Sequence, residues 1–175
     1  FSGQAVTTKY LGHGAMCGND IALEATESHY SPTSPPPYMA GAAEIDLDPE
    51  TGHIELVDFA AVVACGTVIN PALARVQVEG GLVQGIGMAL MEDVTITDKG
   101  RIQQNSFMQY RIPSRMDLGS IRVEFAPSYE PNGPFGAKSI GEIVINTPSP
   151  AIADAVYNAV GVRFTDLPIT AEKVY

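Results

Sequence analysis

The amino-acid sequence predicts an α+β domain with mixed sheets and two main helices. Strand-like alternation surrounds a turn within residues 44–56, and helical patterns follow within 71–92 and 149–161. These segments do not alternate as regular βαβ units, which is typical of α+β rather than α/β proteins. The length of 175 residues suits one ordinary domain or two small ones.

The first thirty residues are small and mixed in character. Residues 18–29 (GNDIALEATESH) place Ile21 and Leu23 among good helix formers, which predicts a short helix. The next segment, 31–37 (SPTSPPP), has four prolines in seven residues, and this favours extended backbone and excludes a helix. A domain boundary near 31–37 and a rigid connection within one domain of residues 1–175 fit this composition equally well.

A β-hairpin is predicted after the proline-rich segment. Residues 44–48 alternate polar and apolar side chains, and 49–52 (PETG) supply a proline and a glycine at turn positions. Alternation resumes over 53–56, and 59–65 is continuously apolar. The second strand is therefore expected to enter the interior.

The hairpin is followed by a predicted helix over residues 71–92, with Pro71 suited to the first helical position. This helix contains four interior glycines, each of which costs about 0.5–1 kcal/mol relative to alanine. They are Gly80, Gly81, Gly85 and Gly87. Such a cost predicts that another backbone or a large ligand approaches the helix closely.

The last third of the chain is predicted to add strands and a helix. In order, we expect a strand–turn–strand around 98–100, irregular structure over 104–119, a strand over 121–126 and a loop over 127–136. A final helix is expected to begin with Ser149 as its N-cap and Pro150 at its first position, and to end at Gly161.

Composition excludes several classes of function. The net charge is −10, and the ten Lys and Arg residues form no basic patch, so a nucleic-acid partner is not expected. The apolar fraction of 45% argues against an intrinsically disordered chain. No apolar run approaches the roughly 20 residues of a membrane-spanning helix, so a membrane partner is not expected either.

The sequence does not predict a metal site on this chain. Cys17 and Cys65 are far apart, and so are His13, His29 and His53, with none of the spacings that zinc or iron–sulfur sites use. Two unpaired thiols in a reducing compartment are favoured over a disulfide, which an acidic extracellular module would contain. Thiol titration after denaturation separates these two interpretations.

Glu142 is a candidate general base. It follows Gly141 and precedes the apolar residues 143–145, and apolar neighbours desolvate a carboxylate and make it a stronger base near neutral pH. Gly141 would also let the backbone approach a bulky cofactor. From spacing alone, a surface glutamate after a turn fits better. The helix adds further polar candidates that face either inwards or solvent: Gln77, Glu79 and Gln84.

Three blocks together resemble a known family. They are AAEIDLDPETGHIELVDFAAVVACGTVINP (42–71), QVEGGLVQGIGMALMED (77–93) and GAKSIGE (136–142), and the chain closes with LPITAEKV (167–174). In order and spacing they are similar to the C-terminal part of the molybdopterin-binding subunit of the xanthine oxidase and aldehyde oxidoreductase family of molybdenum hydroxylases. The resemblance implies the molybdopterin-binding-domain fold and extends from about residue 30 to the end.

The resemblance also implies roles for individual residues. Glu142 matches the glutamate that takes a proton from a metal-bound hydroxyl, whose oxygen attacks an electron-poor carbon of an aldehyde or a purine- or nicotinate-like N-heterocycle. Gln77 matches a glutamine that hydrogen-bonds the pterin. Lys138, Ser139, Ile140 and Gly141 would lie along the cofactor through their backbone. No residue of this chain is implied as a metal ligand.

The implied enzyme is larger than this chain. Its cofactor would be molybdenum–molybdopterin, in the cytosine dinucleotide form if the protein is bacterial, with [2Fe–2S] clusters and FAD on partner chains or domains. The chain begins with Phe1 rather than Met, and we expect a piece of a longer subunit or half of a split one, working in the cytoplasm with a small-molecule substrate. The alternative is a non-catalytic binding domain that keeps the fold without the cofactor.

Overall fold

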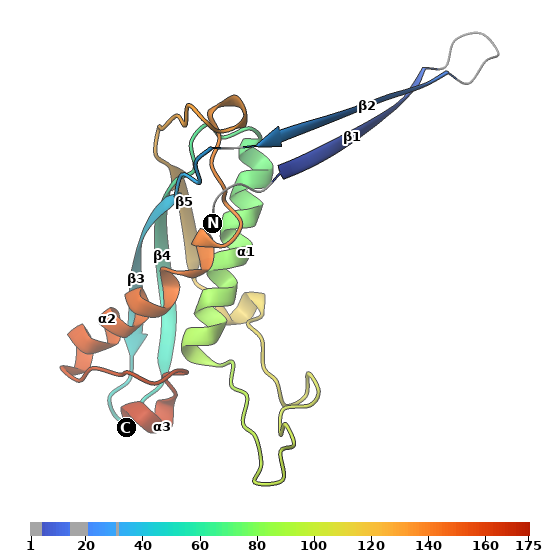
Figure 1. The fold of residues 1–175 in the computed structure, drawn as a ribbon. Helices are drawn as coiled ribbons and strands as arrows, with labels where there is room; N and C mark the ends of the chain where they lie inside the picture. Colours follow the sequence, from blue (N-terminus) through green and yellow to red (C-terminus); the bar gives the residue numbers. More distant parts are fainter. Residues whose placement is uncertain (1–4, 15–20, 31) are drawn as a thin grey trace.

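The body of the molecule is a small sheet with two long helices, and a β-hairpin projects from it (Figure 1). The computed structural model describes residues 5–14, 21–30 and 32–175. Their elements are, in chain order, β1 (Ala5–Gly14), β2 (Ile21–Tyr30), β3 (Tyr38–Leu47), β4 (Ile54–Ala64), α1 (Pro71–Leu90), η1 (Arg115–Asp117), β5 (Ser120–Phe125), η2 (Pro134–Gly136), η3 (Ile143–Ile145), α2 (Pro148–Val160) and α3 (Ala171–Val174).

The body sheet is mixed, as the sequence predicts. Its strand order is β3-β4-β5, with β4 antiparallel to β3 and parallel to β5. The predicted turn joins β3 to β4, and Gly52 adopts the positive φ of 70° that favours glycine. A bulge interrupts this pair, because Glu44 pairs with Asp58 whereas Ile45 pairs with Leu56, which leaves Val57 without a partner.

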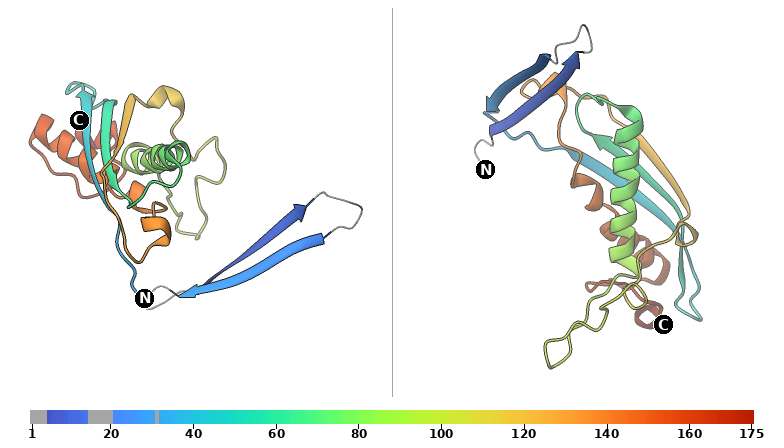
Figure 2. Two further views of the ribbon diagram at one scale, coloured as in Figure 1. Left: turned by 90° about the horizontal axis from the view of Figure 1, so that it is seen from above. Right: turned by 90° about the vertical axis from the view of Figure 1, so that its right-hand side faces the viewer.

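One apolar core lies between the sheet and the two helices. Helix α2 contacts β3, and α1 contacts α2, η3 and β5, so both helices pack on the same face of the sheet. Seen from above, α1 is viewed end-on beside the strands, and the β1–β2 hairpin extends away from the body (Figure 2). The largest fully buried side chains include Phe59, Leu56, Leu82, Ile86 and Ile152.

Helix α1 starts where the sequence predicts and ends two residues earlier. Asn70 caps it: the side-chain oxygen Oδ1 accepts a hydrogen bond from the Leu73 N–H at 3.1 Å, and Pro71 occupies the first turn. The cap satisfies one of the backbone donors that the first turn leaves without a helical partner. The start of α1 is therefore fixed by local chemistry.

Replacing Asn70 by alanine is expected to lower the free energy of unfolding by about 1 kcal/mol, because the cap is lost. Asn70→Asp is the matched control, since aspartate keeps an acceptor oxygen at the same position. Chemical denaturation of the purified protein checks both variants. Equal losses in the two variants would show that the hydrogen bond to Leu73 is not the source of the effect.

The helix glycines confirm in part the prediction of a close approach. A Cβ added at Gly81 would lie 2.0 Å from Val144 Cγ2, and one at Gly85 would lie 2.7 Å from Pro148. The segment that approaches α1 here belongs to the same chain. Gly80 differs, because nothing lies within 4 Å of an added Cβ there.

Helix α2 begins one residue before the predicted N-cap. Thr147 is the N-cap residue, and Ser149 lies inside the first turn, where its hydroxyl donates to the Gly85 carbonyl at 3.3 Å. The N-cap prediction was therefore wrong, because a contact with α1 uses the serine instead. The predicted stop is confirmed: Gly161 ends the helix with φ 75°. Among the described residues no helix is both long and apolar enough to cross a membrane.

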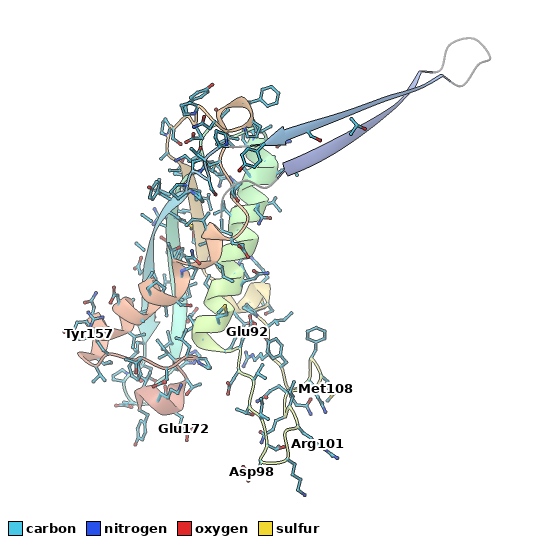
Figure 3. All side chains as sticks on the ribbon, viewed as in Figure 1. Glu92, Asp98, Arg101, Met108, Tyr157 and Glu172 are labelled. Carbon is cyan, nitrogen blue, oxygen red and sulfur yellow. The ribbon has the colours of Figure 1, made fainter. Side chains whose placement is uncertain are left out.

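The segment between α1 and β5 is a long loop that contains the predicted turn at 98–100, where the Gly100 N–H donates to the Thr97 carbonyl, but the flanking residues do not form the predicted strands. A single β-bridge joins Ile96 to Ile102, and the rest is irregular apart from the short turn η1. Figure 3 shows Asp98, Arg101 and Met108 on this loop, well beyond the C-terminal end of α1. Apolar and polar residues alternate here over only a few positions, and a two-stranded hairpin without a third strand is too weak to form a regular hydrogen-bonded ladder.

The short helix predicted over 18–29 was wrong. Residues 21–30 form β2, which pairs antiparallel with β1 along its whole length, and residues 18–20 lie outside the described part. Ile21, Leu23 and Ala25 alternate with period two, and strand pairing decides in favour of this pattern over helix propensity. Residues 32–37 contain neither helix nor strand, as their prolines predict; a domain boundary there stays a prediction.

Candidate functional site

The loop of residues 136–142 is attached to the end of β4 by backbone hydrogen bonds. The Lys138 N–H donates to the Cys65 carbonyl at 2.7 Å, and the Thr67 N–H donates to the Gly136 carbonyl at 2.8 Å. Gly66 permits this approach: its φ is 70°, and an added Cβ would lie 2.2 Å from the Gly136 oxygen. The loop thus starts from a defined position on the sheet.

The far end of this loop is attached to α1. The Gln77 Nε2 group donates a hydrogen bond to the Gly141 carbonyl oxygen at 3.0 Å, although the two residues are 64 positions apart in the sequence. Immediately downstream, Val144 is buried against Gly81 of the same helix. Two of the candidate residues, Gln77 and Gly141, are therefore brought into direct contact.

Glu142 lies at a hollow of about 300 Å³ between α1 and the loop. The hollow, called the α1 hollow below, is lined by Val76, Gln77, Gly80, Gly81, Gln84, Gly141, Glu142, Val144 and Ile145. The hollow brings the candidate base together with Gln77, Gln84 and Gly141, which lie in two separate segments of the sequence. Glu79 does not line it, and pairs instead with Arg75 at 3.9 Å.

The expectation that apolar neighbours desolvate Glu142 was wrong for this chain by itself. Glu142 is exposed, and the apolar residue nearest to it that is fully buried, Val144, points into α1 rather than over the carboxylate. Val144 and Ile145 of the helical turn η3 line the α1 hollow together with Glu142, yet the glutamate itself stays exposed.

The other predicted cofactor contacts lie earlier in the same loop, before Gly141. Lys138 and Ile140 line a second hollow of about 260 Å³, which also includes Gln77, Cys65 and Leu73. Ser139 is exposed and does not line either hollow. The two hollows share Gln77, so this residue stands between the loop backbone and the candidate base.

The structure adds residues that sequence reasoning did not select for the site. Gly80 and Val76 line the α1 hollow, and Gln84, which the sequence left undecided, lies on the same helix face two turns from Gln77. The only sequence signal at Gly80 was that a glycine inside a helix lowers the stability of that helix. The neighbouring Gly81 gives the same signal, although in the structure Gly81 packs against Val144 of the same chain.

Cys65 lies beneath the Lys138 end of the loop. The thiol is free and 3% exposed, and burial raises its pKa, against a smaller lowering effect of the nearby Lys138 charge. The Lys138 amine lies 5.3 Å from the ring centre of Tyr38, a cation–π distance. Cys17 lies outside the described residues, so the expectation of two free thiols extends here only to Cys65.

We expect Cys65 to resist alkylation in the folded protein at neutral pH and to react once the protein is unfolded. Its raised pKa keeps the thiol protonated, and burial denies access to the reagent, whereas the thiolate is the reactive form. Peptide mapping by mass spectrometry after iodoacetamide treatment follows this residue separately from Cys17. Rapid labelling of Cys65 in the native protein would contradict the burial seen here.

The donor set around the α1 hollow suits an organic group rather than a bare metal ion. Within the described residues, no cluster of three or more His, Cys, Asp or Glu could hold a metal. The hollow instead offers the amide groups of Gln77 and Gln84 and, at Gly80, helix backbone that no side chain covers. Amides donate and accept hydrogen bonds without charge, which matches the nitrogen and oxygen pattern of a pterin ring.

Comparison with known proteins identifies the family. Residues 2–119 match the model of the molybdopterin cofactor-binding domain, and the chain belongs to this family. It is 36% identical over 166 residues to the probable hypoxanthine oxidase XdhD of Escherichia coli. The matched region covers 94% of this chain and 17% of XdhD. It is 37% identical over 133 residues to PaoC, the aldehyde oxidoreductase molybdenum-binding subunit of the same organism, over 75% of this chain and 18% of PaoC.

A solved structure confirms the fold. Quinoline 2-oxidoreductase from Pseudomonas putida 86 superposes with a TM-score of 0.78 at 31% identity, over 87% of this chain and 20% of that one. The resemblance to the molybdenum-binding subunits of xanthine dehydrogenases and aldehyde oxidoreductases is therefore confirmed, as is the fold class. This chain spans about a fifth of the length of these relatives.

Proposed function

We propose that this chain forms one side of the active site of a molybdenum hydroxylase. The enzyme would oxidatively hydroxylate a carbon of an aldehyde or of a purine- or nicotinate-like N-heterocycle, with water as the oxygen source. The observation that carries this proposal is the α1 hollow, in which Gln77 and Glu142 line one space in a chain that belongs to the molybdopterin-binding family. The names of the relatives, an aldehyde oxidoreductase and a quinoline oxidoreductase among them, support the two substrate classes.

The residues of the hollow would hold the cofactor by uncharged contacts. Gln77 and Gln84 supply amide groups, and the backbone of 138–141 offers its own donors and acceptors along the loop. When bound, the molybdenum cofactor would supply a redox centre that takes up the electron pair released at the substrate carbon. The cytosine dinucleotide form of the cofactor stays a proposal that rests on the family resemblance.

Glu142 would act as the general base. Its carboxylate oxygens, exposed at the hollow, can accept a proton from the water-derived oxygen nucleophile as that oxygen bonds to the substrate carbon. Because Glu142 is held at the rim, it needs no long movement to reach a group bound in the hollow, and such positioning lowers the barrier. Closure of the site by other parts of the enzyme would exclude bulk water and strengthen the base.

Partner segments are proposed to cover the face of α1 beside the hollow. Leu73 and Val76 are 67% and 65% exposed there, and burial of such side chains contributes about 1.5–3 kcal/mol each. We propose that the remainder of the molybdopterin-binding subunit covers this face. Iron–sulfur and FAD subunits or domains would then carry electrons away. A cytoplasmic location is a proposal that the free thiol of Cys65 supports.

Isotope labelling of the product tests this function. The assembled enzyme, purified through this chain, is incubated with a panel of aldehydes and N-heterocycles, an artificial electron acceptor and water enriched in heavy oxygen. We expect a hydroxylated product or carboxylic acid that carries the label. Unlabelled product formed with oxygen from O₂, or no product from any member of the panel, would argue against the proposal.

A further inference from the structure

We propose that Gln77 is a positioning residue for Glu142, an inference that rests on the proposed function. The Gln77 Nε2 group donates to the Gly141 carbonyl at 3.0 Å, so the amide holds the peptide immediately before the candidate base. Within the described part of the chain, no residue hydrogen-bonds the Glu142 carboxylate itself. The position of that carboxylate therefore depends on how its backbone is held.

The backbone of Glu142 is held on both sides by the same face of α1. Upstream, Gln77 bonds Gly141; downstream, Val144 is buried against Gly81, where an added Cβ would lie 2.0 Å from Val144 Cγ2. Gln77 and Gly81 are four residues apart and so are neighbours on one helix face. Helix α1 thus contacts the chain just before and just after the candidate base.

Of these two contacts, the upstream one depends on a single side chain, that of Gln77. Gly141 is exposed, and a Cβ added there would meet only the Ser139 hydroxyl oxygen, at 3.9 Å, so packing does not restrain this glycine. The Gly141 N–H reaches the Ser139 hydroxyl only at 3.4 Å. Because glycine has wide backbone freedom, loss of the Gln77 bond would let the peptide before Glu142 rotate.

The same amide retains groups for a ligand. Gln77 has two N–H donors and a carbonyl acceptor, and the bond to Gly141 uses one donor. Gln77 lines both hollows, so its second N–H and its carbonyl oxygen stay available to a ligand bound there. A direct cofactor contact and the positioning role are therefore compatible, and the experiment must separate them.

The test uses the assembled enzyme purified through this chain, with variants Gln77→Leu and Gln77→Glu, which cannot donate to the Gly141 carbonyl. Turnover is normalised to bound molybdenum, and kcat and KM are measured separately. We expect kcat to fall about 10- to 100-fold, as a displaced catalytic group predicts, with KM and molybdenum content unchanged. Asn158→Leu, an exposed amide on α2, is the control for a surface amide-to-leucine change.

A double variant separates positioning from other roles. If Gln77 acts through Glu142, the variant Q77L/E142Q should turn over no more slowly than E142Q alone, because residues that act as a unit are not additive. Multiplied losses in the double variant would overturn the inference. Loss of molybdenum from Q77L with normal turnover per molybdenum would also overturn it, and would leave Gln77 as a cofactor ligand only.

The two proposals fail in different ways. Full activity of E142Q would contradict the proposed function, whatever the Gln77 variants do. An inactive E142Q that retains molybdenum, together with wild-type kcat in Q77L and Q77E, would leave the proposed function intact and reject only the positioning role of Gln77.

Discussion

Glu142→Gln is expected to reduce kcat of the assembled enzyme by about 10²–10⁴-fold, the range of general-base catalysis, with its molybdenum content unchanged. Glutamine keeps the size of the side chain and cannot accept the proton. Because Glu142 is exposed and glutamine has the same shape, the fold should tolerate the change. Steady-state kinetics and elemental analysis of the same preparation provide both quantities.

Glu124→Gln is the matched control for this prediction. Glu124 is also an exposed glutamate, but it lies on β5 beside Arg122, on the sheet face away from the helices. We expect this variant to keep wild-type turnover. An E142Q enzyme as active as the E124Q enzyme would refute the base assignment, and a large loss in both would indicate a general effect of removing negative charge.

Gly81→Ala is expected to destabilise the protein by about 1–3 kcal/mol through overpacking. The added methyl group would overlap Val144, whose Cγ2 and Cβ atoms lie 2.0 and 2.7 Å from the position that the new Cβ would take. Val144 is fully buried and cannot move into solvent without exposing part of the core. The segment that carries Glu142 would be pushed away from α1.

The neighbouring glycine provides the opposite expectation. Gly80→Ala meets nothing within 4 Å, so the better helix propensity of alanine should raise the free energy of unfolding by about 0.5–1 kcal/mol. Denaturant titration of both variants measures the change in the free energy of unfolding, which we expect to be positive for G80A and negative for G81A. Equal stability of G80A and G81A would mean that α1 and residues 143–145 do not pack as described.

Much of the body of the fold follows from local sequence signals. Alternation and the Pro49–Gly52 turn predict the β3–β4 pair, Pro71 marks the start of α1, and Gly161 marks the end of α2. Each of these features depends on residues close together in the chain, where the backbone preferences of glycine and proline decide the outcome.

The errors arise where a distant contact overrides a local preference. Residues 21–30 have acceptable helix propensity, yet pairing with β1 makes them a strand. Ser149 has the character of an N-cap residue, but the close approach of α2 to Gly85 gives its hydroxyl another partner. Short alternation around 98–100 fails to form strands because no third strand supports it.

The candidate site was only partly accessible from sequence. Local composition singled out Glu142 and the helix glycines, and family resemblance supplied Gln77. The bond between Gln77 and Gly141 joins positions 64 residues apart, and no pattern within either segment signals it. Likewise, the four glycines look alike in sequence, whereas only the fold separates Gly80, which opens onto the hollow, from Gly81, which packs against Val144.

The most direct measurement of the central claim is the molybdenum and pterin content of the native complex purified through this chain. If the α1 hollow forms one side of a molybdopterin site, both should be present in amounts close to that of the chain, together with iron and partner chains. A properly folded sample that contains no molybdenum, no iron and no partner would contradict the account and would leave a binding domain without catalytic function.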